Sequence, residues 1–271
     1  MAFTTTARQA GNNAKTSVTT LTTAAATNTA DSLLLAFASS TQDDFGADRA
    51  PAISTPTGGG LTWTEVVKAG ETEGWSLNGL SPDTDQAIAC HRAVVGGSPS
   101  SFAITHDHAT AGNSAFMGAA TVDITGHDPT TPIIQAKANG GTSGGGDSES
   151  GTVEFTSALT VGSRVIVYWG PAADVNSTPA DPTIGGQTMT SVMTSDVGYH
   201  TYRISYRDIT GDETDKIITC ADLGEDVLAF TVIAVEVAAA AQDVTAQFLQ
   251  ASQIFQPAVT VGSVGVTAQL I

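Results

Sequence analysis

Basic side chains are scarce in this sequence. Its 271 residues include 27 acidic and only 10 basic ones, so the formal net charge is −17. A protein that holds DNA or RNA by the phosphates needs a basic patch, and an acidic chain is repelled by anionic membrane surfaces. The few lysines, moreover, are scattered along the chain. We therefore expect neither nucleic acid nor a membrane among its partners.

Long apolar runs and cysteines are also few. The strongest apolar runs, 33–37 and 232–235, are much shorter than the roughly 20 residues that span a bilayer. Residues 1–17 lack a basic start followed by an apolar core, so we expect no signal peptide. Cys90 and Cys220 could form one disulfide at most, and without a CxxC pair they are more simply interpreted as buried thiols.

Helical periodicity is absent as well. No stretch keeps apolar residues at i, i+3, i+4 and i+7 over several turns. Short β-branched and apolar runs alternate instead with clusters of Gly, Pro, Asn, Asp and Ser, a pattern that predicts strands joined by turns. The expected strands are residues 16–22, 31–39, 61–68, 86–94, 101–106, 115–125, 152–160, 163–170, 187–193, 200–209, 215–221 and 228–237. We therefore expect an all-β, antiparallel fold.

The series of strands occurs twice. GGLTWTEV at 59–66 matches GGQTMTSV at 185–192, and the flanking strands follow in the same order in both halves. Each half also ends on a long apolar strand with one acidic residue near its end, in TVDI at 121–124 and in AVEV at 234–237. We interpret this as an internal duplication of units of about 100 residues, the size of a β-sandwich.

The predicted organisation is therefore a tandem β-sandwich with extensions. A Gly/Ser-rich stretch between the halves is typical of a flexible linker. The expected parts are an N-terminal arm 1–16, a first sandwich 17–136, a linker 137–151, a second sandwich 152–240 and a C-terminal attachment segment 241–271. A single jelly roll of about 220 residues, in which the halves pair into common sheets, is the alternative.

The C-terminal segment repeats a short apolar motif, VTAQFL at 244–249 and VTAQLI at 266–271. A strand-like apolar segment of this kind packs either on its own sandwich or along a neighbouring copy. We expect the second, a homo-oligomeric contact. The candidate assembly residues are Phe248, Leu249, Ile254, Phe255, Pro257, Val259, Val261, Val264, Val266, Leu270 and Ile271.

These motifs carry a family resemblance. IFQPAVTVGSVGVTAQLI at 254–271 is similar to short repeats in tail and appendage proteins of tailed bacteriophages, and DSLLLAF at 31–37 with TWTxV at 62–66 resembles β-rich virion proteins of such phages. The resemblance implies a structural protein on the virion outer surface, as a capsid decoration, head fibre or tail appendage. It implies the major capsid or tail proteins as partners, no cofactor and no enzymatic activity.

Metal-binding candidates are few. His106 and His108 alternate along an expected strand and could share a metal ion with Asp128, but we favour their interpretation as solvated residues of a polar turn. Acidic clusters at 43–48 and 212–215 lack the full calcium-loop pattern and are more simply turn charges.

Tryptophans offer the other candidate site. Trp75 lies in a polar loop and could stack on a sugar of a host-surface glycan, whereas Trp63 and Trp169 fit core positions. No hydrolase elbow, zinc-protease motif or phosphate-binding loop occurs. A glycan-binding or receptor-binding module is therefore the alternative function, and a hydrolase of the particle is the least favoured one.

Overall fold

The chain is all-β, as predicted. The computed structural model describes residues 2–16, 20–43, 53–69, 84–107, 115–142, 151–172, 179–197, 200–221 and 229–241. These residues form antiparallel strands and no helix, so none of them belongs to a helix that could cross a membrane. The strands are β1 (Thr4–Thr16), β2 (Thr20–Thr22), β3 (Ala26–Thr27), β4 (Leu33–Asp43), β5 (Thr64–Ala69), β6 (Thr84–Val94), β7 (Ser101–Phe102), β8 (Thr105–Asp107), β9 (Ala115–Thr125), β10 (Ile133–Thr142), β11 (Gly151–Glu154), β12 (Arg164–Ala172), β13 (Thr183–Ile184), β14 (Gln187–Thr188), β15 (Thr190–Val197), β16 (His200–Asp208), β17 (Ile217–Cys220) and β18 (Ala229–Val237).

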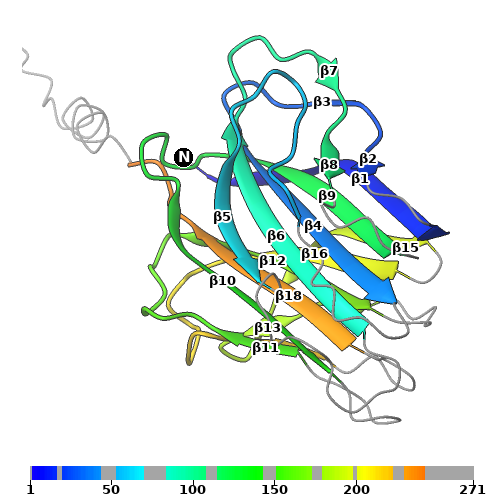
Figure 1. Ribbon diagram of the computed structural model, residues 1–271. Helices are drawn as coiled ribbons and strands as arrows, with labels where there is room; N and C mark the ends of the chain where they lie inside the picture. The colour runs from blue at the N-terminus through cyan, green and yellow to red at the C-terminus, as the bar shows by residue number, and fades with distance from the viewer. Residues whose placement is uncertain are drawn as a thin grey trace, which may run out of the picture. The chain divides into compact units, whose positions relative to one another are not determined.

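Two five-stranded sheets form the centre of the fold (Figure 1). Sheet I has the order β1-β9-β4-β6-β5, and sheet II has the order β10-β18-β12-β16-β15. The two orders become identical when each strand of the first half is matched with its counterpart in the second. The registers also agree: Leu33 pairs with Val94 on one side and with Ile124 on the other, and Arg164 pairs in the same way with Asp208 and Val237.

The repeated sequence motif has the same local backbone in both halves. The β5–β6 pairing shifts register between Glu65 and Val67, and the β15–β16 pairing shifts at the equivalent place, between Ser191 and Met193. The Gly-Gly pair before each hairpin has positive φ, for example 52° at Gly185. A Cβ there would lie 2.7 Å from the Asp215 carbonyl oxygen, so only glycine fits this turn.

The two sheets face each other across one core. β5 lies against β10, and β1 lies against β15, so an approximate twofold rotation exchanges the halves. The equivalent residues Phe37 and Tyr168 stack near the centre, with ring centroids 5.6 Å apart. Fully buried side chains of both sheets surround them: Leu33, Leu35, Ile88, Val122 and Ile124 from sheet I, and Ile166, Tyr202, Ile204, Ile233 and Val235 from sheet II.

An outer layer covers the other face of each sheet. Sheet II carries the four-stranded sheet β11-β17-β13-β14, and the core between them includes Phe155 and Trp169. Sheet I carries the short pairs β2–β8 and β3–β7 together with the segment around Ile53. The fold therefore has two kinds of interior: the core shared by the two main sheets, and the smaller cores between each main sheet and its outer layer.

The organisation differs from the sequence-based expectation. Residues 17–136 and 152–240 do not form two separate sandwiches, because the main sheets of the two halves share one core. The N-terminal arm expected at 1–16 contains β1, which pairs with β9 from Thr4 to Thr16. The expected linker 137–151 begins inside β10, which pairs with β18 along its length. Both are edge strands of a main sheet, and an edge strand needs hydrogen bonds on one side only and few apolar residues of its own.

Candidate functional site

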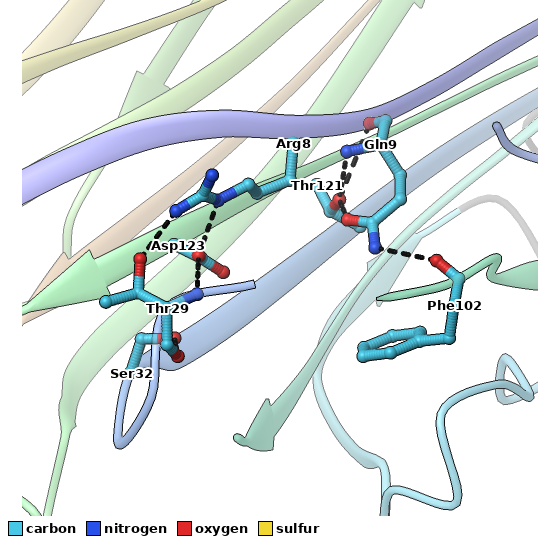
Figure 2. Close-up of polar contacts among 7 residues, drawn as sticks. All are labelled: Arg8, Gln9, Thr29, Ser32, Phe102, Thr121 and Asp123. Carbon is cyan, nitrogen blue, oxygen red and sulfur yellow. Dashed lines mark hydrogen bonds and ion pairs between the residues drawn. The ribbon is translucent and has the colours of Figure 1, made fainter. Parts of the chain in front are cut away.

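Asp123 of β9 is a carboxylate buried beneath the edge of sheet I (Figure 2). Its side chain is 1% exposed. The Arg8 Nε–H and the Thr29 backbone N–H both donate to Oδ2, each across 2.6 Å, and Arg8 also donates to the Thr29 hydroxyl. No donor among the described residues reaches Oδ1. The ion pair thus ties β1 to β9 and to the turn that precedes β4.

A β-bulge brings two polar side chains of β1 to this place. Arg8 and Gln9 together stand opposite Thr121, because the register shifts between Ala7 and Ala10. The fully buried Gln9 donates through Nε2 to the Phe102 carbonyl, and the Thr121 hydroxyl donates to Gln9 Oε1. Because of the bulge, two consecutive residues of β1 reach the same face of β9. Arg8 bonds to Asp123 there, and Gln9 bonds to Thr121.

Glu236 of β18 occupies the equivalent position in sheet II. It is fully buried, and three neutral groups donate to it: Nε2 of Gln135 at 2.6 Å, the Thr160 backbone N–H at 2.7 Å and the Ser163 hydroxyl at 2.7 Å. The second half therefore stabilises its buried carboxylate with neutral hydrogen bonds, whereas the first half uses an ion pair.

Arg164 of β12 joins the two sheets near the N-terminus. Its guanidinium forms a bidentate ion pair with Asp208, at 2.6 and 2.8 Å, and donates to the Thr5 hydroxyl at 2.8 Å. It also lies over the rings of Tyr206 and Phe3, 4.0 and 5.1 Å from their centroids. Arg164 thereby holds the start of β1 against sheet II.

His106 is buried rather than solvated in a polar turn, which corrects the sequence-based interpretation. It lies on β8, whose pairing with β2 and strand alternation turn the ring inward beneath the outer layer, while His91 of β6 is buried nearby. No partner among the described residues reaches either ring nitrogen of His106. Burial, and then the neighbouring His91, lower the pKa of His106 to about 4.

The protein is expected to lose stability through His106 as the pH falls from about 6.5 to about 4. In this window the unfolded chain binds a proton that the folded chain excludes, so the loss grows as the pH falls and reaches about 3 kcal/mol. Urea unfolding of the wild type and of His106→Phe across this range measures it. The variant lacks this loss, and equal acid losses in both proteins would contradict the assignment.

Asp128, another metal candidate, forms hydrogen bonds of its own. Asp128 accepts backbone N–H groups of Thr131 and Thr130, at 3.0 and 2.7 Å, which hold the pKa of its carboxyl below the ordinary value. His108 lies outside the described residues. Within the part of the chain that the structure describes, no three His, Cys, Asp or Glu side chains could hold a metal ion.

The remaining predicted residues fall into two groups. Trp169 is fully buried, and Trp63 packs at the edge of a small core beneath the outer layer of sheet I. Cys90 and Cys220 are buried and unbridged, and burial raises the pKa of both thiols. Trp75 and the assembly residues between 248 and 271 lie outside the described residues.

Two open pockets lie on the described surface. One, of about 400 Å³, is lined in part by Glu213 and Lys216, which already pair with Arg207 at 2.7 Å and with Glu154 at 3.4 Å. The other, of about 480 Å³, lies beside β5 and β6 and is lined in part by Arg92. The first pocket is thus lined by both acidic and basic side chains, whereas the only charged side chain among the described residues that line the second is an arginine.

Sequence patterns indicated part of this arrangement. The acidic residues Asp123 and Glu236 stood out near the end of the last strand of each half, but their partners Arg8 and Gln135 lie on β1 and β10, which were not predicted. No sequence signal distinguished Arg92. The amino-acid sequence matches no protein-family model and no curated protein.

Proposed function

We propose that this chain is a structural component of a tailed-phage virion, exposed on the outer surface of the particle. It serves there as a capsid decoration, head fibre or tail appendage. It acts by assembling with other copies of itself and with the major capsid or tail proteins, and it catalyses no reaction.

The observation that carries this proposal is how the buried and partly buried charged side chains are paired. Asp123 is engaged by Arg8, and Arg203 forms a bidentate ion pair with Asp181, at 2.6 Å for both bonds. A catalytic pair is expected to face a pocket, and none of these four side chains lines either of the two pockets described above. Each of these pairs holds one strand to another strand or turn, which favours a rigid building block.

Two further features support the same role. The segment 254–271 resembles repeats of phage tail and appendage proteins, and the net charge of −17 keeps the surfaces of neighbouring particles apart. Because β1 of the expected N-terminal arm belongs to sheet I, we assign the attachment role to 241–271 alone. The glycan alternative gains no support from Trp63 or Trp169, since both pack inside the fold.

Removal of residues 242–271 tests the assembly role. We expect purified particles to contain the full chain at a fixed stoichiometry, and antibodies against it to label intact particles. The truncated chain is expected not to be incorporated. Thermal unfolding of the truncated chain is the control, because residues 2–241 contain both sheets and their shared core. Absence of the full chain from purified particles, or normal incorporation of a folded truncated chain, would contradict the proposal.

A further inference from the structure

We propose that the pocket beside Arg92 binds a carboxylated sugar. This inference goes beyond the assembly role and does not depend on it. The pocket is lined by the end of β6, by Thr64 at the start of β5 and by the turn that precedes β5. Its volume of about 480 Å³ lies within the range of small-molecule sites.

The guanidinium of Arg92 is the one charged group among the described residues that line this pocket. Arg92 is half-buried, and its side chain makes no hydrogen bond or ion pair with any described residue. The other described arginines each pair with a carboxylate: Arg8, Arg164, Arg203 and Arg207. A partly desolvated charge without a partner is costly, and a carboxylate bound through two parallel N–H groups is its natural partner.

The second half carries a carboxylate at the position of Val94. Val94 is equivalent to Asp208, since they pair with the equivalent residues Leu33 and Arg164. In sheet II the Asp208 carboxylate pairs with Arg164, which is the counterpart of Leu33, whereas Arg92 is the counterpart of Tyr206. At the position of Asp208, sheet I carries an apolar side chain that is 52% exposed. A carboxylate for Arg92 must therefore come from outside these residues.

The rest of the lining fits a sugar ring. The exposed Thr62 and Thr64 offer hydroxyl groups, and Leu61 and Val94 offer apolar surface for the C–H face of the ring. Gly60 adds no side chain, and the space at its Cβ position is open for at least 4 Å. The pocket thus offers hydroxyl groups to the hydroxyls of a sugar acid, apolar groups to its C–H face and a cation to its carboxylate.

Ligand-observed NMR with three small probes tests the inference. The probes are methyl β-D-glucuronide, its neutral counterpart methyl β-D-glucoside, and acetate. We expect the glucuronide to bind at least about tenfold more tightly than either of the others, because it alone joins the carboxylate to the ring. Equal binding of the glucoside would overturn the role of Arg92. Equal binding of acetate would overturn the role of the sugar, and no binding of the glucuronide would overturn both.

Matched variants locate the site. Arg92→Gln is expected to weaken glucuronide binding by roughly tenfold to a hundredfold, whereas Lys137→Gln, which alters an exposed lysine on β10, leaves it unchanged. Val94→Asp places a carboxylate at the position equivalent to Asp208 and is expected to abolish glucuronide binding. Val94→Asn introduces a side chain of the same shape as aspartate but without the charge, and is expected to preserve binding. Thermal unfolding verifies that each variant is folded. Full binding by a folded Arg92→Gln or Val94→Asp variant would overturn the proposal.

Discussion

Replacing Tyr168 by alanine is expected to destabilise both halves of the protein together, by about 4 kcal/mol. Tyr168 is fully buried between the sheets and stacks on Phe37 and on Tyr202, with ring centroids 5.6 and 5.4 Å away. Its hydroxyl is 2.6 Å from that of Ser39 in sheet I. Truncation opens a cavity in the shared core, which neither sheet can close without moving the other.

Urea unfolding combined with hydrogen exchange measures this effect. Because the core is shared, amides in β4 and in β12 are expected to lose protection to the same extent. Tyr168→Phe is the matched control: it keeps the ring, removes only the hydrogen bond to Ser39, and is expected to cost about 1 kcal/mol. Protection lost in β12 but retained in β4 would show that the halves are stabilised independently, against the shared core.

Asp123→Asn is expected to cost about 3 kcal/mol, clearly more than Glu236→Gln at the equivalent position, for which about 1 kcal/mol is expected. The first change leaves the Arg8 guanidinium without its counter-charge, although the 23% exposure of that side chain lets water solvate part of it. Glu236 has only neutral donors, so a glutamine there still accepts hydrogen bonds from Thr160 and Ser163 and loses the one from Gln135.

A double-mutant cycle separates the ion pair from general packing. Arg8→Gln in the Asp123→Asn background removes the uncompensated charge, so the double variant is expected to be no less stable than Asp123→Asn alone. Amides of β1 are expected to exchange faster in Asp123→Asn, since the pair fastens this edge strand. Additive losses, or equal costs for Asp123→Asn and Glu236→Gln, would show that the ion pair contributes nothing specific.

Sequence reasoning succeeded where the strands are apolar. The strands expected at 115–125 and 200–209 nearly coincide with β9 and β16, because central strands carry their own hydrophobic pattern. It missed β1 and β10, which are rich in Thr, Gly and Asn. These segments become strands because a neighbouring strand supplies hydrogen bonds along one side. That information lies in the partner and not in the segment.

The candidate sites divide in the same way. His106 was noticed as a metal candidate and as a turn residue, but the burial that governs its chemistry depends on an outer layer formed by β2 and β8. Arg92 was a basic residue near the end of an expected strand and gave no signal of a binding role, since a single arginine at such a place is ordinary. Its significance arises from its place in the pocket and from the apolar Val94 at the position that Asp208 occupies in sheet II.

The sequence by itself determined the all-β class, the repeated hairpin motif and the excess of negative charge, because alternation, glycine turns and composition are local properties. Only the tertiary structure decided that the sheets meet face to face across one core. It also decided that Arg8 reaches Asp123, 115 residues away along the chain, and that Arg92 forms no ion pair with a carboxylate of the described residues. These outcomes depend on which surfaces pack together, and the sequence of one segment does not determine how it packs against a distant segment.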